Sequence, residues 1–370
     1  MSTLVQLHRP GLVEYEDGLR MQERLVPFIQ EEKIPAQVFL LEHPHVITLG
    51  RRASPANVLV DAQLRRVWQV QLYESVRGGD VTYHGPGQLV LYPLLALPPE
   101  RQDLVRYVRD LEEVMLRTLA DFGLTGSRIP GLTGAWVGDN KIGAIGVRMA
   151  RWVTSHGLAL NVNTDLRYFD LIVPCGIRDH GVTSMQQLLG APQPLETVAE
   201  RLLFHLAEVF QLTLQAQPVH LKSIQGVIFR RSTTLEALIL HRLPHKGDFW
   251  QPVTGRIEPG ESPQQAAERE IEEETGLRGQ VLPLDYTHGF MLEPELLPHS
   301  APLPFMGEEH SFYLEVSPEQ EVKLEATAHD TFEWLPWEEA ARKVRWPGNR
   351  EGILRAGERL LGLTPQDREG

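Results

Sequence analysis

Cysteine is almost missing from this 370-residue chain, which contains a single one, Cys175. A lone cysteine cannot form an internal disulfide and cannot by itself build a structural zinc site. Two interpretations stay open for Cys175: a buried structural thiol, or a nucleophile. Scarce cysteine is also typical of proteins from a reducing compartment, so we expect a cytoplasmic protein.

Long apolar runs and a surplus of positive charge are missing as well. The first ten residues, Met1–Pro10, lack the apolar core of a signal peptide. The longest apolar stretch, around Leu89–Leu97, is interrupted by Pro93 and is too short to span a bilayer. Residues 1–217 contain 20 Lys and Arg against 23 Asp and Glu, and the remainder contains 16 against 26. We therefore expect neither a membrane nor a nucleic acid as partner.

Lysine is rare compared with arginine, and residues 1–217 contain only Lys33 and Lys141. A lysine in a segment so rich in arginine suggests a role that requires loss of a proton, which arginine cannot provide. The alternative for Lys141 is an ordinary solvated surface lysine.

The length of the chain favours two domains. Apolar residues recur at helical spacing in Arg101–Phe122 and again in Leu195–Leu212. A polar stretch that ends in a proline follows, and strand-like runs begin beyond it. We therefore expect a first domain over residues 1–214, a linker over 215–221 and a second domain over 222–370.

Three segments of the first domain carry the functional information. The block Arg77–Pro93 has four glycines close together, which leaves room for a ligand beside the backbone. The block Lys141–Arg148 alternates with glycine, as in a strand with one open face. Cys175 stands between a proline and a glycine, a pattern that favours a turn able to expose the sulfur.

Together these segments resemble the octanoyltransferase (lipoate–protein ligase B) family over roughly residues 5–210. The resemblance rests on motifs that follow one another in the family's order: Arg77-Gly78-Gly79, Thr82-Tyr83-His84-Gly85-Pro86-Gly87-Gln88, Lys141-Ile142-Gly143, Gly146-Val147-Arg148, Ser155-His156-Gly157 and Pro174-Cys175-Gly176.

The resemblance implies an α+β, lipoate/biotin-ligase-like acyltransferase domain that needs no cofactor. Such an enzyme moves an octanoyl group from acyl carrier protein to a lysine of a lipoyl domain, in 2-oxoacid dehydrogenases or the glycine cleavage H protein. Cys175 would accept the acyl group as a thioester, and Lys141 would be its catalytic partner. A related alternative is a lipoate ligase, which activates the free acid with ATP and needs no cysteine thioester.

The same resemblance implies an acyl pocket. Its residues come from the motifs above: Arg77, Gly78, Gly79, Tyr83, His84, Gly85, Ala144, Ile145, Gly146, Ser155, His156 and Gly157. His84 and His156 have a second interpretation as structural histidines whose ring nitrogens are satisfied inside the protein.

The second domain contains a glutamate-rich run whose terminal residues predict a helix. Ser262 is a candidate N-cap with Gln265 as its capping-box partner, Pro263 suits the first helical position, and Gly276 suits the end. Glu270, Glu273 and Glu274 then share one helix face. Hard oxygen ligands of this kind favour Mg²⁺ or Mn²⁺, although a glutamate run can also be a solvated acidic face.

The run Gly255–Leu277 resembles the Nudix box at every defined position. That resemblance implies an α/β/α Nudix domain with metal-dependent hydrolysis of a nucleotide-type small molecule. Glu270, Glu273 and Glu274 would be metal ligands or the base, joined by the Gly255 carbonyl. Glu261 and Arg269 would form a supporting ion pair.

Weaker similarities, outside the Nudix box, suggest a substrate class for the second domain. The segments Phe249–Gly255, Glu333–Leu335 and Trp346–Arg350 are similar to the dihydroneopterin triphosphate diphosphatase branch of the Nudix superfamily. A further acidic ligand is expected from a later loop, either Glu308 or Glu309. The alternative from another functional class is a Nudix domain that senses a nucleotide without cleaving it.

Overall fold

The computed structural model describes residues 3–174, 179–292 and 303–363. Its chain divides into two compact units, Met1–Pro218 and Val219–Gly370. Within the described ranges, no helix is long and apolar enough to cross a membrane.

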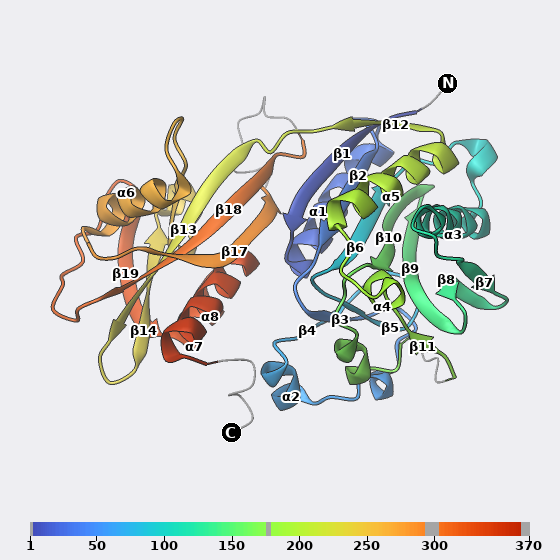
Figure 1. Ribbon diagram of the computed structural model, residues 1–370. Helices are drawn as coiled ribbons and strands as arrows, with labels where there is room; N and C mark the ends of the chain where they lie inside the picture. Colours follow the sequence, from blue (N-terminus) through green and yellow to red (C-terminus); the bar gives the residue numbers. More distant parts are fainter. Residues whose placement is uncertain (1–2, 175–178, 293–302, 364–370) are drawn as a thin grey trace. The chain divides into compact units, whose positions relative to one another are not determined.

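Unit 1 is built on a large mixed sheet with the strand order β12-β1-β2-β6-β10-β9-β8-β7, in which β11 also pairs with β9 (Figure 1). The strands are β1 (Thr3–Leu12), β2 (Gln37–Glu42), β6 (Gln88–Leu94), β7 (Ser127–Ile129), β8 (Leu132–Val137), β9 (Asn140–Ala150), β10 (Val153–Asn161), β11 (Gly181–Val182) and β12 (Leu212–Ala216). The expected linker 215–221 is partly regular, because Gln215 and Ala216 pair with β1 and the first strand of unit 2 begins at Leu221.

A smaller sheet with the order β4-β3-β5 carries the start of the glycine-rich block. It consists of β3 (Val46–Leu49), β4 (Gln71–Glu74) and β5 (Val81–His84). The short helical turns near it are η1 (Pro55–Asn57), α2 (Ala62–Val67) and η3 (Leu166–Leu171). Ile47, Val81 and Phe169 belong to the separate apolar core that these elements enclose.

Both predicted helices of unit 1 are present, as α3 (Leu104–Asp121) and α5 (Leu195–Phe210). α3 begins later than the apolar pattern suggested, because Asp103 caps it by accepting N–H bonds from Val105 and Arg106. The residues before it form the turn η2 (Pro99–Arg101). The remaining helices are α1 (Tyr15–Gln30) and α4 (Met185–Leu189).

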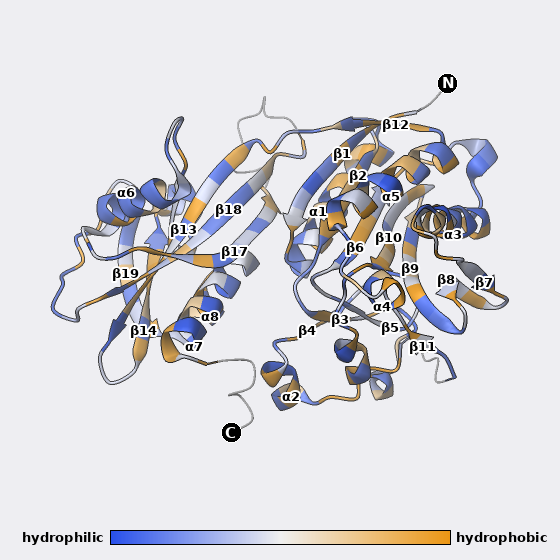
Figure 2. Ribbon diagram, in the orientation of Figure 1, coloured by the Kyte–Doolittle hydropathy of each residue, from blue (hydrophilic) through white to orange (hydrophobic). Residues whose placement is uncertain are grey.

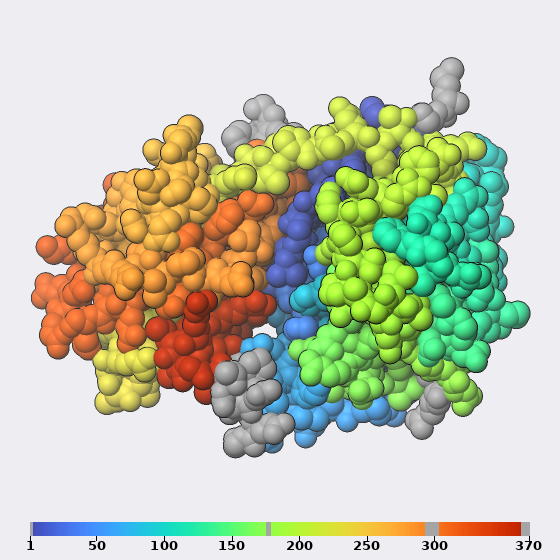
Figure 3. Space-filling view, in the orientation of Figure 1, coloured from blue at the N-terminus to red at the C-terminus, as the bar shows by residue number. Residues whose placement is uncertain are grey.

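The main core of unit 1 lies between α3, α5 and the sheet. Leu111 and Met115 of α3 and Leu202 and Leu206 of α5 are fully buried there. In the space-filling view, α3 and α5 form much of the face of unit 1 that is turned to the viewer (Figure 3). The buried stripes on these two amphipathic helices therefore hold the sheet that carries Lys141.

Unit 2 is a sheet with helices on its two faces. The strand order is β15-β14-β13-β18-β17, with β16 on β13 and β19 on β14. The strands are β13 (Leu221–Arg231), β14 (Leu235–Arg242), β15 (Trp250–Gln251), β16 (Val253–Arg256), β17 (Leu282–Met291), β18 (Met306–Val316) and β19 (His329–Pro336). The helical elements are η5 (Pro244–Lys246), α6 (Pro263–Thr275), α7 (Trp337–Lys343) and α8 (Pro347–Leu361).

Alternate residues of β13 face the two helix layers. Gly226 packs against Ile271 of α6, whereas Gln225 donates a hydrogen bond to the Gly348 carbonyl at the start of α8. Figure 2 shows that α6 is mostly hydrophilic, and its few apolar residues, among them Ala267 and Ile271, are buried together with Glu274 and Thr275. The face of α6 that carries most of its glutamates is therefore left for chemistry rather than packing.

Candidate functional sites

The predicted pocket segments of unit 1 meet on the strands β9 and β10. Strand pairing places His156 opposite Val147 and Gly157 opposite Gly146. The Gly78 N–H donates a hydrogen bond to the Val147 carbonyl at 3.0 Å, which ties the glycine-rich block to the same point.

Arg77, a predicted pocket residue, is a buried cation, only 6% exposed. Its guanidinium donates to the Thr48 hydroxyl at 2.8 and 3.1 Å and to the Thr48 carbonyl at 2.7 Å. Glycine at position 146 leaves room for this placement, since a Cβ there would lie in tight contact, 3.0 Å from Arg77 Cδ. Ala144, Ile145 and Gly146 follow one another on β9, but Ile145 packs against the main core of unit 1 rather than toward Arg77.

The pocket histidines are neutral at physiological pH. Burial lowers the pKa of His84 to about 3 and that of His156 to about 3, and the nearby Arg77 charge adds to both shifts. His84 Nδ1 donates to the Gln88 side-chain oxygen at 2.7 Å, because the Gln88 amide nitrogen is itself donating to Asn161. His84 Nε2 therefore carries the lone pair.

His156 has an unusual backbone. Its φ is +56°, a left-handed conformation that costs free energy for a residue with a side chain. Its N–H donates to the Gln22 side-chain oxygen of α1 at 2.6 Å. Gln22 is itself 3% exposed and donates to the Gly18 carbonyl. This contact fixes His156, and with it the Ser155–Gly157 motif.

A further buried histidine, His43, belongs to the same cluster and was not predicted. Its Nδ1 donates to the Val13 carbonyl at 2.6 Å, so its Nε2 accepts from the Tyr92 hydroxyl at 2.7 Å. Burial lowers the pKa of His43 to about 4. Its ring lies 5.8 Å from the ring of His84. The available signal was a histidine directly after the buried run of β2.

Tyr83, another predicted pocket residue, belongs to the apolar core of the small sheet. It is fully buried, and its hydroxyl forms a hydrogen bond with His45 Nδ1 at 2.7 Å. Its ring stacks on Tyr168 at 5.1 Å. A Cβ at position 85 would lie 1.8 Å from the Tyr83 hydroxyl, so Gly85 makes room for this tyrosine.

Lys141 is buried in β9, 8% exposed, with its Nζ 5.3 Å from the centre of the Trp136 ring. This burial argues against an ordinary surface lysine. Cys175 lies outside the described residues.

The helix α6 of unit 2 has the predicted ends. Ser262 accepts from the Gln265 N–H, the Gln265 side chain accepts from the Ser262 N–H, and Gly276 ends the helix with φ +69°. The local sequence therefore specifies this helix before any packing, as expected.

The helix glutamates differ in burial. Glu274 is 8% exposed, and burial, followed by the charge of Glu270, raises the pKa of Glu274 to about 8. Burial also raises the pKa of Glu270. Glu274 Oε2 has no hydrogen-bond partner among the described residues. Glu273 is more exposed and lies 3.2 Å from Arg269.

Arg269 gathers the carboxylates around it. It donates to Glu261 at 2.9 and 3.0 Å, which is the predicted pair, and to Glu270 at 2.8 Å. Gly255 is required beside them, because a Cβ there would lie 1.9 Å from Glu270 Cδ. Among the residues that the structure describes, no group of three or more His, Cys, Asp or Glu side chains is arranged to hold a metal ion.

The donor chemistry nevertheless fits a hard divalent cation. Glu270 and Glu274 are crowded carboxylates whose raised pKa values show that negative charge there needs compensation, and Glu274 has an unused oxygen. Glu325 adds a third charge, since it raises the pKa of Glu274 and its N–H donates to the Glu274 carbonyl.

Glu308 and Glu309 lie on opposite faces of the sheet. Glu309 pairs with Ser223 and its carboxylate accepts from Asn349 of α8 at 3.0 Å. Glu308, one residue earlier, therefore points to the face covered by α6, where it lies 3.0 Å from His310. The sequence could not choose between them, because their side is set by strand pairing.

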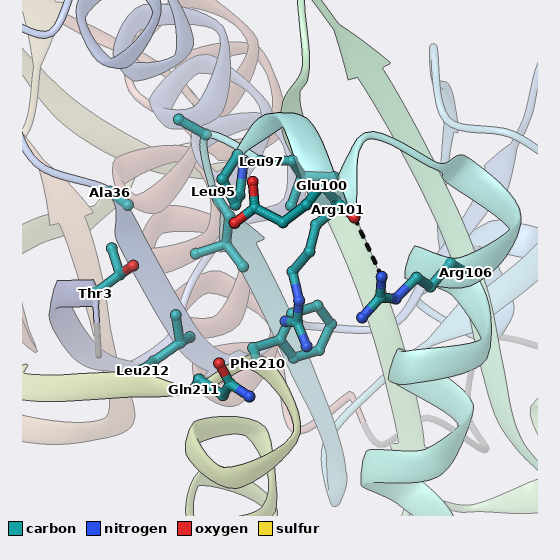
Figure 4. Close-up of a pocket in the computed structure, with 12 residues that line it drawn as sticks. Thr3, Ala36, Leu95, Leu97, Glu100, Arg101, Arg106, Phe210, Gln211 and Leu212 are labelled. Atoms are coloured by element: carbon teal, nitrogen blue, oxygen red, sulfur yellow. Dashed lines mark hydrogen bonds between the residues drawn. The ribbon is translucent and has the colours of Figure 1, made fainter. Parts of the chain in front are cut away.

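A cavity of about 260 Å³ elsewhere in unit 1 contains none of the predicted site residues. Figure 4 shows Arg101 stacked on Phe210 at its wall and Arg106 donating to the Glu100 carbonyl.

Comparisons with known proteins agree with the two-part organisation. Residues 14–207 match the family described as lipoyl protein ligase A/B catalytic domain, and residues 220–356 match the NUDIX domain. An octanoyltransferase from Myxococcus xanthus is 44% identical over 360 residues, which cover 95% of this chain and 99% of that protein. This chain belongs to the octanoyltransferase family and carries a C-terminal Nudix domain.

Another octanoyltransferase, from Solibacter usitatus, is 47% identical over 208 residues, 56% of this chain and 94% of that protein. The solved structure of E. coli dihydroneopterin triphosphate pyrophosphohydrolase has 28% identity and a TM-score of 0.34, and covers 40% of this chain and 100% of that one. The family matches confirm the predicted fold class, a lipoate-ligase-like domain followed by a Nudix domain. A Nudix domain generally depends on a divalent metal.

Proposed function

We propose that unit 1 transfers an octanoyl group from octanoyl-acyl carrier protein to a lysine of lipoyl domains. The acceptors would be lipoyl domains of 2-oxoacid dehydrogenases and the glycine cleavage H protein. The observation that carries this proposal is the buried Lys141, on the strand that also meets the glycine-rich block. The close relationship to octanoyltransferases supports it.

The proposed chemistry has two steps. The Cys175 thiolate attacks the carbonyl carbon of the donor thioester, a new C–S bond forms, the old C–S bond breaks, and the Lys141 ammonium protonates the leaving carrier thiolate. The lysine amine of the lipoyl domain then attacks the Cys175 thioester, an amide forms, the C–S bond breaks and Cys175 leaves as a thiolate. Lys141 takes the proton that the attacking amine must lose, which an arginine could not do.

The pocket suits an uncharged acyl chain. Neutral His84 and His156, together with Gly78, Gly79 and Gly146, line it without placing a negative charge near the thioester. Arg77 would position the acyl carbonyl. Tyr83 and Gly85 take part by holding the small sheet, since the Tyr83 hydroxyl is engaged with His45.

Mass spectrometry of the enzyme after reaction with octanoyl-acyl carrier protein tests this proposal. The wild-type chain should gain one octanoyl group, and Cys175→Ser should gain none and transfer none. Full transfer by Cys175→Ser would exclude the thioester. Lipoate ligase chemistry, the alternative, would instead need ATP and free acid and would leave no acyl-enzyme.

We propose that unit 2 hydrolyses a nucleoside-diphosphate-linked metabolite with Mg²⁺ or Mn²⁺. Glu270, Glu274 and the Gly255 carbonyl would hold the metal, with Glu273 as a further ligand or as the base. When bound, the metal neutralises the diphosphate and lowers the pKa of a bound water. Arg269 orients the carboxylates through its contacts with Glu261 and Glu270.

Two residues outside the Nudix box are candidates for completing the site. Glu308 lies on the face of the sheet that α6 covers. The charge of Glu325 is close enough to raise the pKa of Glu274. Glu309 is a weaker candidate because it is buried beneath α8 and accepts from Asn349.

A screen of nucleotide metabolites for Mg²⁺-dependent phosphate or pyrophosphate release tests unit 2. Dihydroneopterin triphosphate is the first substrate to include, because of the segments around the box. Glu270→Gln should abolish release. Glu272→Gln is the matched control, since Glu272 stands on the same helix but pairs with Arg278. Metabolite binding without any release would favour the nucleotide-sensor alternative.

A further inference from the structure

A buried carboxylate on α3 lies behind Lys141. The side chain of Glu112 is fully buried, and both of its oxygens are engaged. One accepts from Arg109 at 2.6 Å and from Arg128 at 3.0 Å. The other accepts from the backbone N–H of Gly134 at 3.1 Å. Burying a charge costs free energy unless it is paired in this way, so a buried carboxylate at this position suggests a specific role.

Gly134 connects this carboxylate to Lys141. Its φ is +128°, and a Cβ there would lie 2.4 Å from the Gly143 carbonyl oxygen and 2.7 Å from Lys141 Cε. Only glycine fits this conformation and this space. The backbone that Glu112 holds is therefore the backbone against which the Lys141 side chain packs.

The pairing of β8 with β9 changes register at the same place. Ala135 pairs with Gly143, but Trp136 pairs with Lys141, so β9 has an extra residue there. Such bulges redirect side chains and occur next to active sites. Here the bulge places the Lys141 ammonium over the face of buried Trp136.

We propose that Glu112 is a positioning residue for Lys141. Its carboxylate, held by Arg109 and Arg128, fixes the Gly134 N–H and keeps β8 against the stem of Lys141. The inference rests on the proposed function of unit 1, in which Lys141 takes the proton in the second step. Neither Glu112 nor Gly134 stands in a motif that the sequence singled out.

Glu112→Gln in the full chain tests the proposal, with Glu113→Gln as the matched control. Glutamine keeps the shape but presents a donor to Gly134 or the arginines. Glu113 also pairs with Arg128, at 2.8 Å, but on the surface. In single turnovers from the acyl-enzyme to a lipoyl domain, Glu112→Gln should be slowed roughly 10- to 100-fold, as for a small misplacement of a catalytic group. Glu113→Gln should match the wild type.

A second pair of variants separates positioning from folding. Gly134→Ala should slow the same step by a similar factor, whereas Gly131→Ala should not. Both glycines have positive φ, but a Cβ at Gly131 would meet nothing within 4 Å. Thermal unfolding of each variant shows whether it is folded. A folded Gly134→Ala with the wild-type rate would overturn the contact with Lys141.

Hydroxylamine provides a readout that a general structural defect would not give. This nucleophile is uncharged at neutral pH, so it needs little help in losing a proton. The Glu112→Gln acyl-enzyme should react with it at close to the wild-type rate. Equal slowing with hydroxylamine and with the lipoyl domain would overturn a role through Lys141.

Lys141→Arg in the same assay distinguishes the two proposals. If Lys141→Arg transfers normally, the base role of Lys141 fails and the inference about Glu112 fails with it. If Lys141→Arg is slow but Glu112→Gln is not, only the positioning role is wrong.

Discussion

The two candidate sites handle charge in opposite ways. In unit 1, the buried groups are a guanidinium, an ammonium and histidines that burial keeps neutral. In unit 2, they are carboxylates that repel one another and are gathered by Arg269. The first arrangement suits an uncharged acyl chain and a thiolate. The second suits a divalent cation and the anionic diphosphate that it neutralises.

The sites also differ in how they are assembled. The predicted pocket residues of unit 1 include residues of strands β5, β9 and β10, and helix α1 supports them through Gln22; these segments are far apart in the sequence. The unit 2 site joins one helix to the strand just before it. A site made of distant segments depends on packing throughout its unit, whereas a local site depends mainly on a few close contacts.

Gly255→Ala should have the largest effect, because it changes the unit 2 site where the backbone of Gly255 lies closest to the Glu270 side chain. The new Cβ would occupy the position of the Glu270 carboxylate. Mg²⁺-dependent hydrolysis should fall by about 100-fold, as expected when the support of a metal ligand is lost. Gly260→Ala, at a positive-φ glycine whose Cβ would meet nothing within 4 Å, is the control. Equal losses in both variants would contradict this explanation.

Gln22→Leu should disturb the predicted site of unit 1, although Gln22 lies on helix α1 and acts only through the His156 backbone. It leaves the buried His156 N–H without its acceptor, which costs about 1–3 kcal/mol of stability. We expect a higher KM for octanoyl-acyl carrier protein, because the Ser155–Gly157 motif shifts. Gln30→Leu removes a similar bond from the same helix to Ala150, away from the pocket. A KM that changes equally in both variants would show that His156 is not the cause.

The neutral histidines make the stability of unit 1 depend on pH. The folded-state pKa values of His43, His84 and His156 lie near 3–4, below the unfolded value of about 6.5. The unfolded chain binds more protons in this window, so their contribution is complete above about pH 6.5 and is lost as pH falls toward 3.

His84→Gln should flatten that dependence by up to about 1.4 kcal/mol per pH unit within the window. Hydrogen exchange of β6 and β10 amides in the full chain measures this in unit 1 alone. An unchanged slope would mean that His84 is not held neutral.

Tyr83→Phe should have the smallest effect. It removes one hydrogen bond to His45 and leaves the stacked ring, which costs about 0.5–1.5 kcal/mol of unit 1 stability. Octanoyl transfer should stay near the wild-type rate because the hydroxyl faces the small sheet. A large loss of octanoyl transfer with normal stability would instead indicate that the Tyr83 hydroxyl acts in the acyl pocket.

The sequence by itself determined the parts whose information is local. The ends of α6 follow from Ser262, Gln265 and Gly276, and helical spacing alone puts Glu270 and Glu274 on one face. The motif order around Lys141 and Cys175 was enough to indicate the family, which the comparisons confirmed.

Only the tertiary structure decided which side chains meet. Strand pairing decided which face of the sheet Glu308 and Glu309 each occupy, and the fold brought His43 next to His84 and placed Tyr83 in the core of the small sheet. The packing of α3 on β8 brought Glu112 to Gly134, whose backbone lies against Lys141. Register between distant strands is set by the packing of the whole sheet, and a shift of one residue exchanges its faces, so no local pattern could have given these contacts.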